Sequence, residues 1–288
     1  TLKELKRIKN FEKIKGIIME IGIIVPCHIK YNFQFTYLVK CLFSLEKQTY
    51  KNNIVVGISF VNEVEYLFFK DIIFPIFKNK VKFIIQRKQT FQMIHIYHCL
   101  QKLQKCDLIL FCDDDDYFIP NRVETFVKLK QENENSKIIR EIIPGHNEES
   151  EYWCYGVEPC LLNDFYKIAK NNIHYLHHKF GDMYLRNFLL HTQNYGDILG
   201  FTAKNPLYVY NTENENSIIR TIKRKKEEME KEGKIDYEEI LDQYLLTIIN
   251  NDSNKNRAMK EKQIIDFEIM NDYLKEEEIR KFCFELYK

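Results

Sequence analysis

Glycine and proline are scarce in this sequence, at nine and six of 288 residues, whereas isoleucine, lysine, asparagine and tyrosine are plentiful. This bias indicates an AT-rich source genome, such as that of a virus or a protist, and carries no mechanistic weight. Long hydrophobic runs are also absent, because no segment approaches the roughly 20 apolar residues that span a bilayer. The opening residues, TLKELKRIKNFEKIKG, lack the apolar core of a signal peptide. We therefore expect a cytoplasmic protein; peripheral membrane association and, since the chain begins at Thr1, an upstream segment are left open.

An excess of charge of one sign is absent too. The 43 lysines and arginines are balanced by 42 aspartates and glutamates, which gives a formal net charge of +1. No global field draws the chain to a polyanion, so we expect no nucleic-acid partner. The eight cysteines form no CxxC pair and no zinc-ligand spacing, so reduced and mostly buried thiols are expected.

The composition that remains is that of a folded protein, with 45% hydrophobic and 30% charged residues. In the first part of the chain, short apolar runs alternate with helical stretches, as in parallel βαβ units. The expected strands span residues 21–26, 54–59, 81–86 and 108–112. The expected helices between them span residues 33–47 and 91–104, with Thr90 as the N-cap of the second.

The order of elements changes after Pro120. We expect a helix at 122–130, strands near 137–143 and 153–157, a helix containing 182–190, and a short strand pair near 198–203 and 207–210. Beyond about residue 216 the chain becomes charged and amphipathic, which predicts a helical extension and a surface for homo-oligomer formation. The predicted fold is therefore α/β, with a mostly parallel sheet flanked by helices and a C-terminal helical extension.

Four aspartates, Asp113 to Asp116, follow the apolar strand in LILFCDDDDYF. Like charges about 5 Å apart repel by roughly 3 kcal/mol per pair at an effective dielectric constant near 20, so a cation is expected there. If the strand continues into the run, Asp113 and Asp115 share one face and Asp114 and Asp116 share the other. Mg²⁺ or Mn²⁺ held by one or two carboxylates completes its shell with water and phosphate oxygens. A solvated acidic turn is the alternative interpretation.

The order of these pieces resembles the GT-A glycosyltransferases, whose fold is Rossmann-like, and especially the inverting members of glycosyltransferase family 2. The resemblance covers about residues 22–217 and rests on five segments: IGIIVPCH, LVKCLFSLEKQTY, LILFCDDDDYFIPNRV, FGDMYLRNFLL and PLYVYNTENENSI. It implies a lead-in at 1–20, a glycosyltransferase domain at 21–216 and an extension at 217–288. Within the domain, the nucleotide-binding half is about 21–120 and the acceptor half about 121–216.

The resemblance also implies roles for individual residues. Pro26 and His28 fall where the first strand meets the nucleotide, and a plain loop histidine is the alternative for His28. Asp113 and Asp114 fall on the nucleotide side of the acidic motif, with Asp113 also near the metal, and Asp115 falls at the metal-binding position.

On the acceptor side, Asp182 falls where such enzymes keep the base that takes the proton of the acceptor hydroxyl, and a helix N-cap is its alternative. Its neighbour Gly181 and the single tryptophan, Trp153, fall in acceptor-facing segments. A core position is the other interpretation of Trp153.

The sequence departs from the family pattern at two places. An aspartate that grips the nucleobase is missing after the second strand, where Ser59 stands, and Arg87 at the next strand end is a candidate replacement. A histidine is missing from the closing loop, where Glu213 is a candidate metal ligand and Arg220, just beyond it, a candidate phosphate clamp. A solvated loop is the alternative for Glu213, and an ordinary surface arginine is the alternative for Arg220.

The function implied is metal-dependent transfer of a sugar, with inversion, by a hexosyltransferase. The expected donor is a nucleotide-diphosphate sugar such as a UDP-sugar, the cofactor Mn²⁺ or Mg²⁺, and the acceptor a hydroxyl of a glycan, glycoprotein or glycolipid. A sugar-phosphate nucleotidyltransferase is one alternative, although VPCHIKYNF lacks the glycine-rich loop that would cradle a triphosphate. A catalytically degenerate relative that binds carbohydrate or a partner protein is another.

Overall fold

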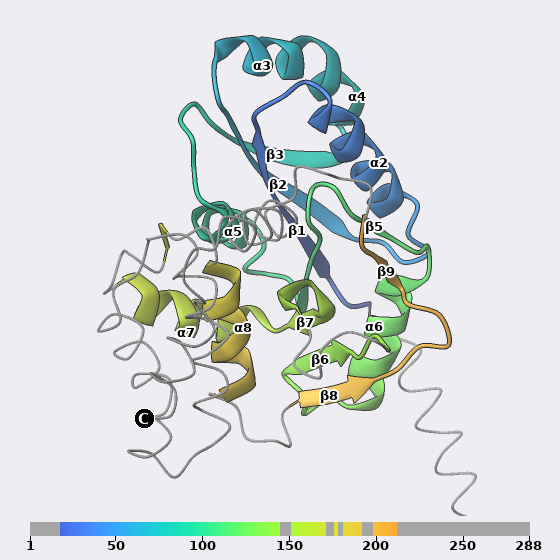
Figure 1. Cartoon of the computed structure of the whole chain (residues 1–288). Coiled ribbons are helices and arrows are strands. Elements are labelled where there is room, and N and C mark those ends of the chain that lie inside the picture. The colour runs from blue at the N-terminus through green and yellow to red at the C-terminus, as the bar shows by residue number, and fades with distance from the viewer. Residues whose placement is uncertain (1–17, 145–150, 171–175, 178–180, 192–197, 212–288) are drawn as a thin grey trace, which may run out of the picture. The chain divides into compact units, whose positions relative to one another are not determined.

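The computed structural model of the protein describes residues 18–144, 151–170, 176–177, 181–191 and 198–211 (Figure 1). The chain divides into two compact units. The first comprises Thr1–Lys179 and Gln193–Tyr210, and the second comprises Phe180–Thr192 and Asn211–Lys288. All the strands described below belong to the first unit, and helix α8 (Gly181–His191) belongs to the second. In the described parts of both units, no helix is long and apolar enough to cross a membrane.

A seven-stranded sheet organises the first unit, in the order β3-β2-β1-β4-β7-β6-β8. Its pairings are parallel except those of β7, which runs antiparallel to both β4 and β6. The expected α/β fold class, with a mostly parallel sheet flanked by helices, is confirmed. The strands are β1 (Ile21–Ile29), β2 (Asn53–Phe60), β3 (Val81–Gln86), β4 (Leu108–Phe111), β6 (Ile138–Glu141), β7 (Tyr155–Val157) and β8 (Ile198–Phe201).

The central strands are buried on both faces, which explains why their sequences are continuous apolar runs rather than alternating patterns. In β1, the side chains of Ile21, Ile23, Ile24 and Val25 are completely buried. Strand β1 pairs with β2 along its whole length, so that His28 lies beside Ser59 at the carboxyl end. It also extends three residues further than predicted and carries His28 inside the sheet.

Helices form most of the connections between the strands and flank the sheet (Figure 1). In α2, buried apolar residues recur at helical spacing, and α5 packs on β1 and β2. Residues 63–77, between β2 and β3, are helical, and neither these helices nor α7 were predicted from the sequence. The helices of the first unit are α2 (Gln34–Glu46), α3 (Glu63–Phe68), the π-helical η1 (Phe69–Ile73), α4 (Phe74–Phe77), α5 (Gln92–Leu100), α6 (Arg122–Glu132), the 3₁₀-helical η2 (Tyr152–Cys154) and α7 (Pro159–Lys170).

A separate two-stranded sheet joins β5 (Tyr117–Phe118) to β9 (Tyr208–Val209) in antiparallel fashion. The prediction of a strand pair near 198–203 and 207–210 located both strands but paired them wrongly, because β8 joins β6 in the main sheet. Pairing across some 90 residues is not encoded in local periodicity. The consequence for the site is that β9 lies beside the segment that directly follows the four aspartates.

The start of α5 also differs from the prediction. Its N-cap position is Phe91, and no side chain caps the helix there. The hydroxyl of Thr90 instead donates to the carbonyl oxygen of Lys88 at 2.9 Å, and its backbone N–H donates to Ser59 Oγ at 3.3 Å. The predicted extension at 217–288, and most of the lead-in at 1–20, lie outside the described residues.

Candidate active site

The four consecutive aspartates form a turn at the carboxyl end of β4. The strand ends at Phe111, and the backbone N–H of Asp116 donates a 3.2 Å hydrogen bond to the carbonyl oxygen of Asp113. The strand therefore does not continue through the four aspartates, and their side chains do not alternate between two faces. The carboxyl groups of Asp113, Asp114 and Asp116 instead point in different directions and contact different segments of the first unit.

Asp113 is half-buried and is held by two neighbouring side chains. Tyr152 Oη donates a hydrogen bond to Asp113 Oδ1. Gln92 Nε2 lies 3.4 Å from the same oxygen and 3.0 Å from Tyr152 Oη. Since Gln92 opens α5 and Tyr152 lies in η2, three separate segments meet at this carboxylate and fix its orientation.

Asp116 anchors the turn to the small sheet. Its side chain is 1% exposed, and Oδ2 accepts a 2.6 Å hydrogen bond from the hydroxyl of Tyr208 in β9. The same hydroxyl accepts the backbone N–H of Asp113 at 3.1 Å. One tyrosine thus holds both ends of the turn. Burial raises the pKa of Tyr208 well above its usual value, so this hydroxyl keeps its proton and remains a donor.

Asp114 points towards β1, where its carboxyl group meets the thiol of Cys27. The pKa of Asp114 is raised to about 7, mainly by burial and then by the charge of the neighbouring Asp115, while the hydrogen bond with the Cys27 thiol opposes the shift. Burial likewise raises the pKa of Cys27 well above its usual value. Cys41 Sγ lies 3.7 Å from Cys112 Sγ and 3.5 Å from the carbonyl oxygen of Asp113. The turn therefore rests on protonated thiols, as expected of the cysteines.

The donor set at this turn fits a metal that is held by few protein ligands. Among the described residues, no group of three or more histidine, cysteine, aspartate or glutamate side chains is arranged to hold a metal ion. Mg²⁺ and Mn²⁺ sites that include substrate phosphates need only one or two carboxylates. The half-buried carboxyl groups of Asp113 and Asp115 are the ones at this turn that suit such a site.

A chain of polar side chains lies at the neighbouring strand ends. Ser59 Oγ is 2.8 Å from His28 Nδ1 and 2.9 Å from His95 Nε2, and Ser59 itself is fully buried. The serine hydroxyl has one hydrogen, so it donates to one imidazole and accepts an N–H from the other. His28 and Ser59, predicted to meet the nucleotide, are thus brought together, and His95 of α5 joins them.

Both imidazoles are neutral at pH 7. Burial lowers the pKa of His28 to about 4, with a further contribution from the charge of Lys30. Burial also lowers the pKa of His95 to about 3, and His28 and His98 add to that shift. In the described part of the chain, His28 Nε2 and His95 Nδ1 are buried without a hydrogen-bond partner. A buried nitrogen in that state is costly unless a ligand completes its bonding.

Behind the turn, a buried ion pair supports Tyr208. The guanidinium group of Arg122 pairs with Glu141 and donates to the carbonyl oxygen of Trp153 at 2.9 Å. Glu141 accepts the backbone N–H of Leu207 at 2.6 Å. Both charged side chains are fully buried, so the pair ties α6, β6 and η2 to the residue that precedes β9.

Trp153 belongs to this core. Its side chain is 4% exposed and stacks on Tyr208, with ring centroids 4.0 Å apart and planes inclined by 13°. This position agrees with the core interpretation of Trp153, and its contact with the acceptor stays a prediction. The indole packs against the tyrosine that holds the aspartate turn.

Arg87 is engaged elsewhere on the same edge of the sheet. Its guanidinium group contacts both carboxylate oxygens of Glu63, at 2.8 and 2.9 Å, and lies 3.7 Å from the ring centroid of Tyr66. The Arg87 side chain is 58% exposed. Arg87 thus contacts α3, and its contact with the nucleotide stays a prediction.

The other residues predicted for the site lie in β1, in the second unit or outside the described residues. Pro26 is buried in β1 beside Gly57. Asp182 is half-buried in the first turn of α8, directly after Gly181, with which the helix begins, so Asp182 is not the N-cap of this helix. Gly181 and Asp182 belong to the second unit, and Glu213 and Arg220 lie outside the described residues.

Four residues of this site were missed in the sequence: Gln92, His95, Tyr152 and Tyr208. Gln92 and His95 are three residues apart on the helix that follows β3, so they share one face towards the strand ends. That spacing was a usable signal. Tyr152 and Tyr208 reach the aspartates only through tertiary packing, and nothing in their local sequence indicates it.

No protein-family model matches the chain, and no curated protein matches it either. Solved structures with a similar fold include S. aureus TarS 1-349 in complex with UDP, at 16% identity over 67% of this chain and 60% of that chain, with a TM-score of 0.48. The same TarS fragment in complex with UDP-GlcNAc is 16% identical over 51% of this chain and 47% of that chain, with a TM-score of 0.41. GalNAc-T7 with UDP, GalNAc and Mn²⁺ is 14% identical over 44% of this chain and 24% of that chain, with a TM-score of 0.38. This chain therefore spans less than two thirds of the length of each.

Proposed function

We propose that this chain is a glycosyltransferase that moves a sugar from a nucleotide-diphosphate sugar, such as a UDP-sugar, to an acceptor hydroxyl. The observation that supports it most is the turn at the carboxyl end of β4, where Asp113 is oriented by Tyr152 and Gln92. In open α/β sheets, ligands bind beyond the carboxyl ends of the strands. An acidic turn that is braced from three sides at that edge is suited to a cation and the phosphates it binds.

The carboxyl groups of Asp115 and Asp113 are the ones that would hold Mn²⁺ or Mg²⁺. The metal, when bound, neutralises negative charge on the diphosphate leaving group. The protein's contribution is to hold the carboxylates still: Tyr208 fixes both ends of the turn, and Tyr152 fixes the Asp113 side chain. Such fixed groups need no reorganisation during the reaction, which is the main source of electrostatic catalysis.

His28 and Ser59 are proposed to contact the nucleotide. When Ser59 donates to His95, His28 Nδ1 donates to Ser59 and His28 Nε2 is left as an acceptor; in the reverse arrangement Nε2 is a donor. His28 Nε2 can therefore bond either a hydroxyl or a carbonyl group of the nucleotide. This pair offers a contact where the sequence lacks the expected aspartate.

Asp182 is proposed as the base that accepts the proton of the acceptor hydroxyl. A carboxylate that attacks no carbon itself but deprotonates the nucleophile leads to inversion at the sugar carbon. The position of Asp182 in the first turn of α8 is also favourable for its negative charge, because that end of a helix dipole is positive. The positive end of the helix stabilises the ionised form that a base requires.

Donor hydrolysis in the presence of Mn²⁺ tests this function. We expect Asp115→Asn to lose turnover by about 100-fold or more, because each tenfold step is only about 1.4 kcal/mol of transition-state stabilisation. Asp71→Asn, which removes an exposed carboxylate in η1, is the matched control and should keep full turnover. Full turnover by Asp115→Asn would remove the metal assignment, and pyrophosphate release from a nucleoside triphosphate would favour nucleotidyl transfer instead.

A further inference from the structure

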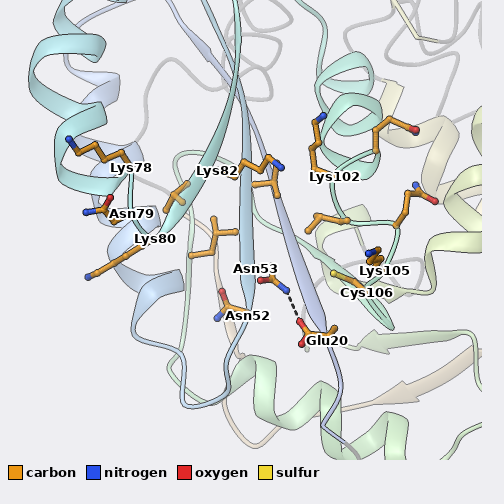
Figure 2. Close-up of a pocket in the computed structure, with 16 residues that line it drawn as sticks. Glu20, Asn52, Asn53, Lys78, Asn79, Lys80, Lys82, Lys102, Lys105 and Cys106 are labelled. Carbon is orange, nitrogen blue, oxygen red and sulfur yellow. Dashed lines mark hydrogen bonds between the residues drawn. The ribbon is translucent and has the colours of Figure 1, made fainter.

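A hollow lies at the opposite edge of the sheet from the aspartate turn (Figure 2). It is formed at the amino ends of β1, β2 and β3 and by residues 101–106, which connect α5 to β4. Its volume is about 850 Å³. Pockets for small ligands typically measure about 300 to 1,000 Å³, so this hollow has room for one.

The lining of this hollow is strongly basic. It contains five lysines and one glutamate, a net charge of +4 in a chain whose formal net charge is only +1. The single glutamate, Glu20, is occupied by the side-chain amide of Asn53, which donates to it at 2.9 Å. The lysines are Lys78, Lys80, Lys82, Lys102 and Lys105.

Most of this positive charge is not neutralised by the protein. Lys80 pairs with Glu46 at 2.8 Å. The other four lysines form no ion pair with any residue that the structure describes, and all of them are exposed. Like charges around one hollow repel each other, and a bound anion would relieve that repulsion.

Several of these lysines have an ordinary explanation when each is considered alone, but these explanations do not account for their position around one hollow. Lys102 and Lys105 follow the carboxyl end of α5, where a cation is favourable to the helix dipole. Lys82 lies on the edge strand β3, where lysine discourages pairing with another chain. In Figure 2, Lys82 extends from β3 towards the side on which Lys102 and Lys105 lie, and the amide of Asn53 lines the same space.

We propose that this hollow binds a small, free ligand that carries two or more phosphate groups, without a divalent metal. Lysine ammonium groups are compact point charges that bind phosphate oxygens, and several of them around one space favour an anion with several charges. The lining offers no carboxylate pair that would recruit a metal. The site is therefore separate in place and in chemistry from the aspartate turn, and it does not depend on the proposed transferase activity.

Calorimetric titration of the full chain with inorganic tripolyphosphate, in buffer containing EDTA, tests this proposal. The chelator removes divalent ions and so prevents metal-dependent binding at the aspartate turn. We expect Lys82→Gln/Lys102→Gln to weaken binding by about tenfold or more, because each hydrogen bond to a charged group contributes that order of affinity. Lys40→Gln/Lys47→Gln, which removes two exposed lysines of α2 and its C-cap, should change binding by less than about twofold.

Three results would overturn the proposal. Absence of tripolyphosphate binding to the unmodified chain would show that the hollow holds no such ligand. An equal loss in the two double variants would show a general attraction of surface charge. A loss of binding in Asp115→Asn would show that the aspartate turn is the site being measured. Since the substituted lysines are exposed, the variants are expected to fold, and their thermal unfolding confirms it.

Discussion

Replacing Tyr208 with phenylalanine should loosen the aspartate turn while leaving the surrounding core filled. The substitution deletes only the hydroxyl that donates to Asp116 Oδ2 at 2.6 Å and accepts the backbone N–H of Asp113 at 3.1 Å. The ring remains stacked against Trp153. Any effect on the turn therefore follows from the lost hydrogen bonds rather than from a cavity.

The magnitude follows from the burial of the Asp116 carboxylate, which is 1% exposed. A hydrogen bond to a buried charged group contributes about 1.5 to 3 kcal/mol, and one to a backbone N–H about 1 kcal/mol. We therefore expect Tyr208→Phe to lower the free energy of unfolding by about 3 kcal/mol. Affinity for UDP in the presence of Mn²⁺ should fall as well, since Asp113 and Asp115 are no longer held in place.

Tyr50→Phe is the matched control. The hydroxyl of Tyr50 also makes two hydrogen bonds, with the backbone N–H of Met19 at 2.9 Å and with its carbonyl oxygen at 3.1 Å, at the other end of β1. Neither partner is charged, and Tyr50 is half-buried, so water can replace part of the two lost bonds. A loss of about 1 to 2 kcal/mol is therefore expected, with UDP affinity unchanged. Urea denaturation measures both free energies. If the two variants lose the same stability, or if Tyr208→Phe binds UDP normally, the turn does not depend on this hydroxyl.

Three further predictions concern the surroundings of the site. Arg122→Met should lower the free energy of unfolding in urea by about 3 to 5 kcal/mol, because it leaves the charge of Glu141 buried and uncompensated. Adding Glu141→Leu should restore much of that loss, and no recovery in the double variant would contradict this prediction. Because burial lowers the pKa values of His28 and His95 to about 4 and 3, the unfolded chain binds protons first as the pH falls below about 6.5, so stability should fall from there down to about pH 4, and less steeply in His95→Gln; equal slopes in thermal unfolding would refute the assignment. Gly57→Ala should lower the free energy of unfolding by about 1 to 3 kcal/mol, because the new Cβ would lie 2.9 Å from His95 Cβ and 3.1 Å from Cys99 Sγ. Unchanged stability would show that α5 moves away freely.

The parts of the fold that could be predicted are those governed by local periodicity and burial. Strand β3 was predicted to the residue, and β1, β2, β4 and α2 were predicted to within a few residues, because continuous apolar runs and helical spacing persist across them. Strand pairing could not be predicted in the same way. The partners of β8 and β9 lie about 60 and 90 residues away, and tertiary packing decides them.

The candidate site shows the same division. The position of the four aspartates at a strand end was predicted, since a polar run directly after an apolar one is visible in the sequence. Their turn was not, because it depends on Tyr208 from a distant strand. For Trp153 the sequence left a core position and an acceptor contact open, and its stacking on Tyr208, which favours the core position, is a tertiary contact that local sequence does not reveal.

The proposed roles of the aspartates are tested most directly by titrating UDP into the full chain with and without Mn²⁺. If Asp115 and Asp113 share a divalent cation with the diphosphate, Mn²⁺ should raise the affinity for UDP by about tenfold or more, which corresponds to about 1.4 kcal/mol. The same addition should have little effect on Asp115→Asn. Equal affinity of the unmodified chain for UDP in the presence and absence of Mn²⁺ would contradict the account.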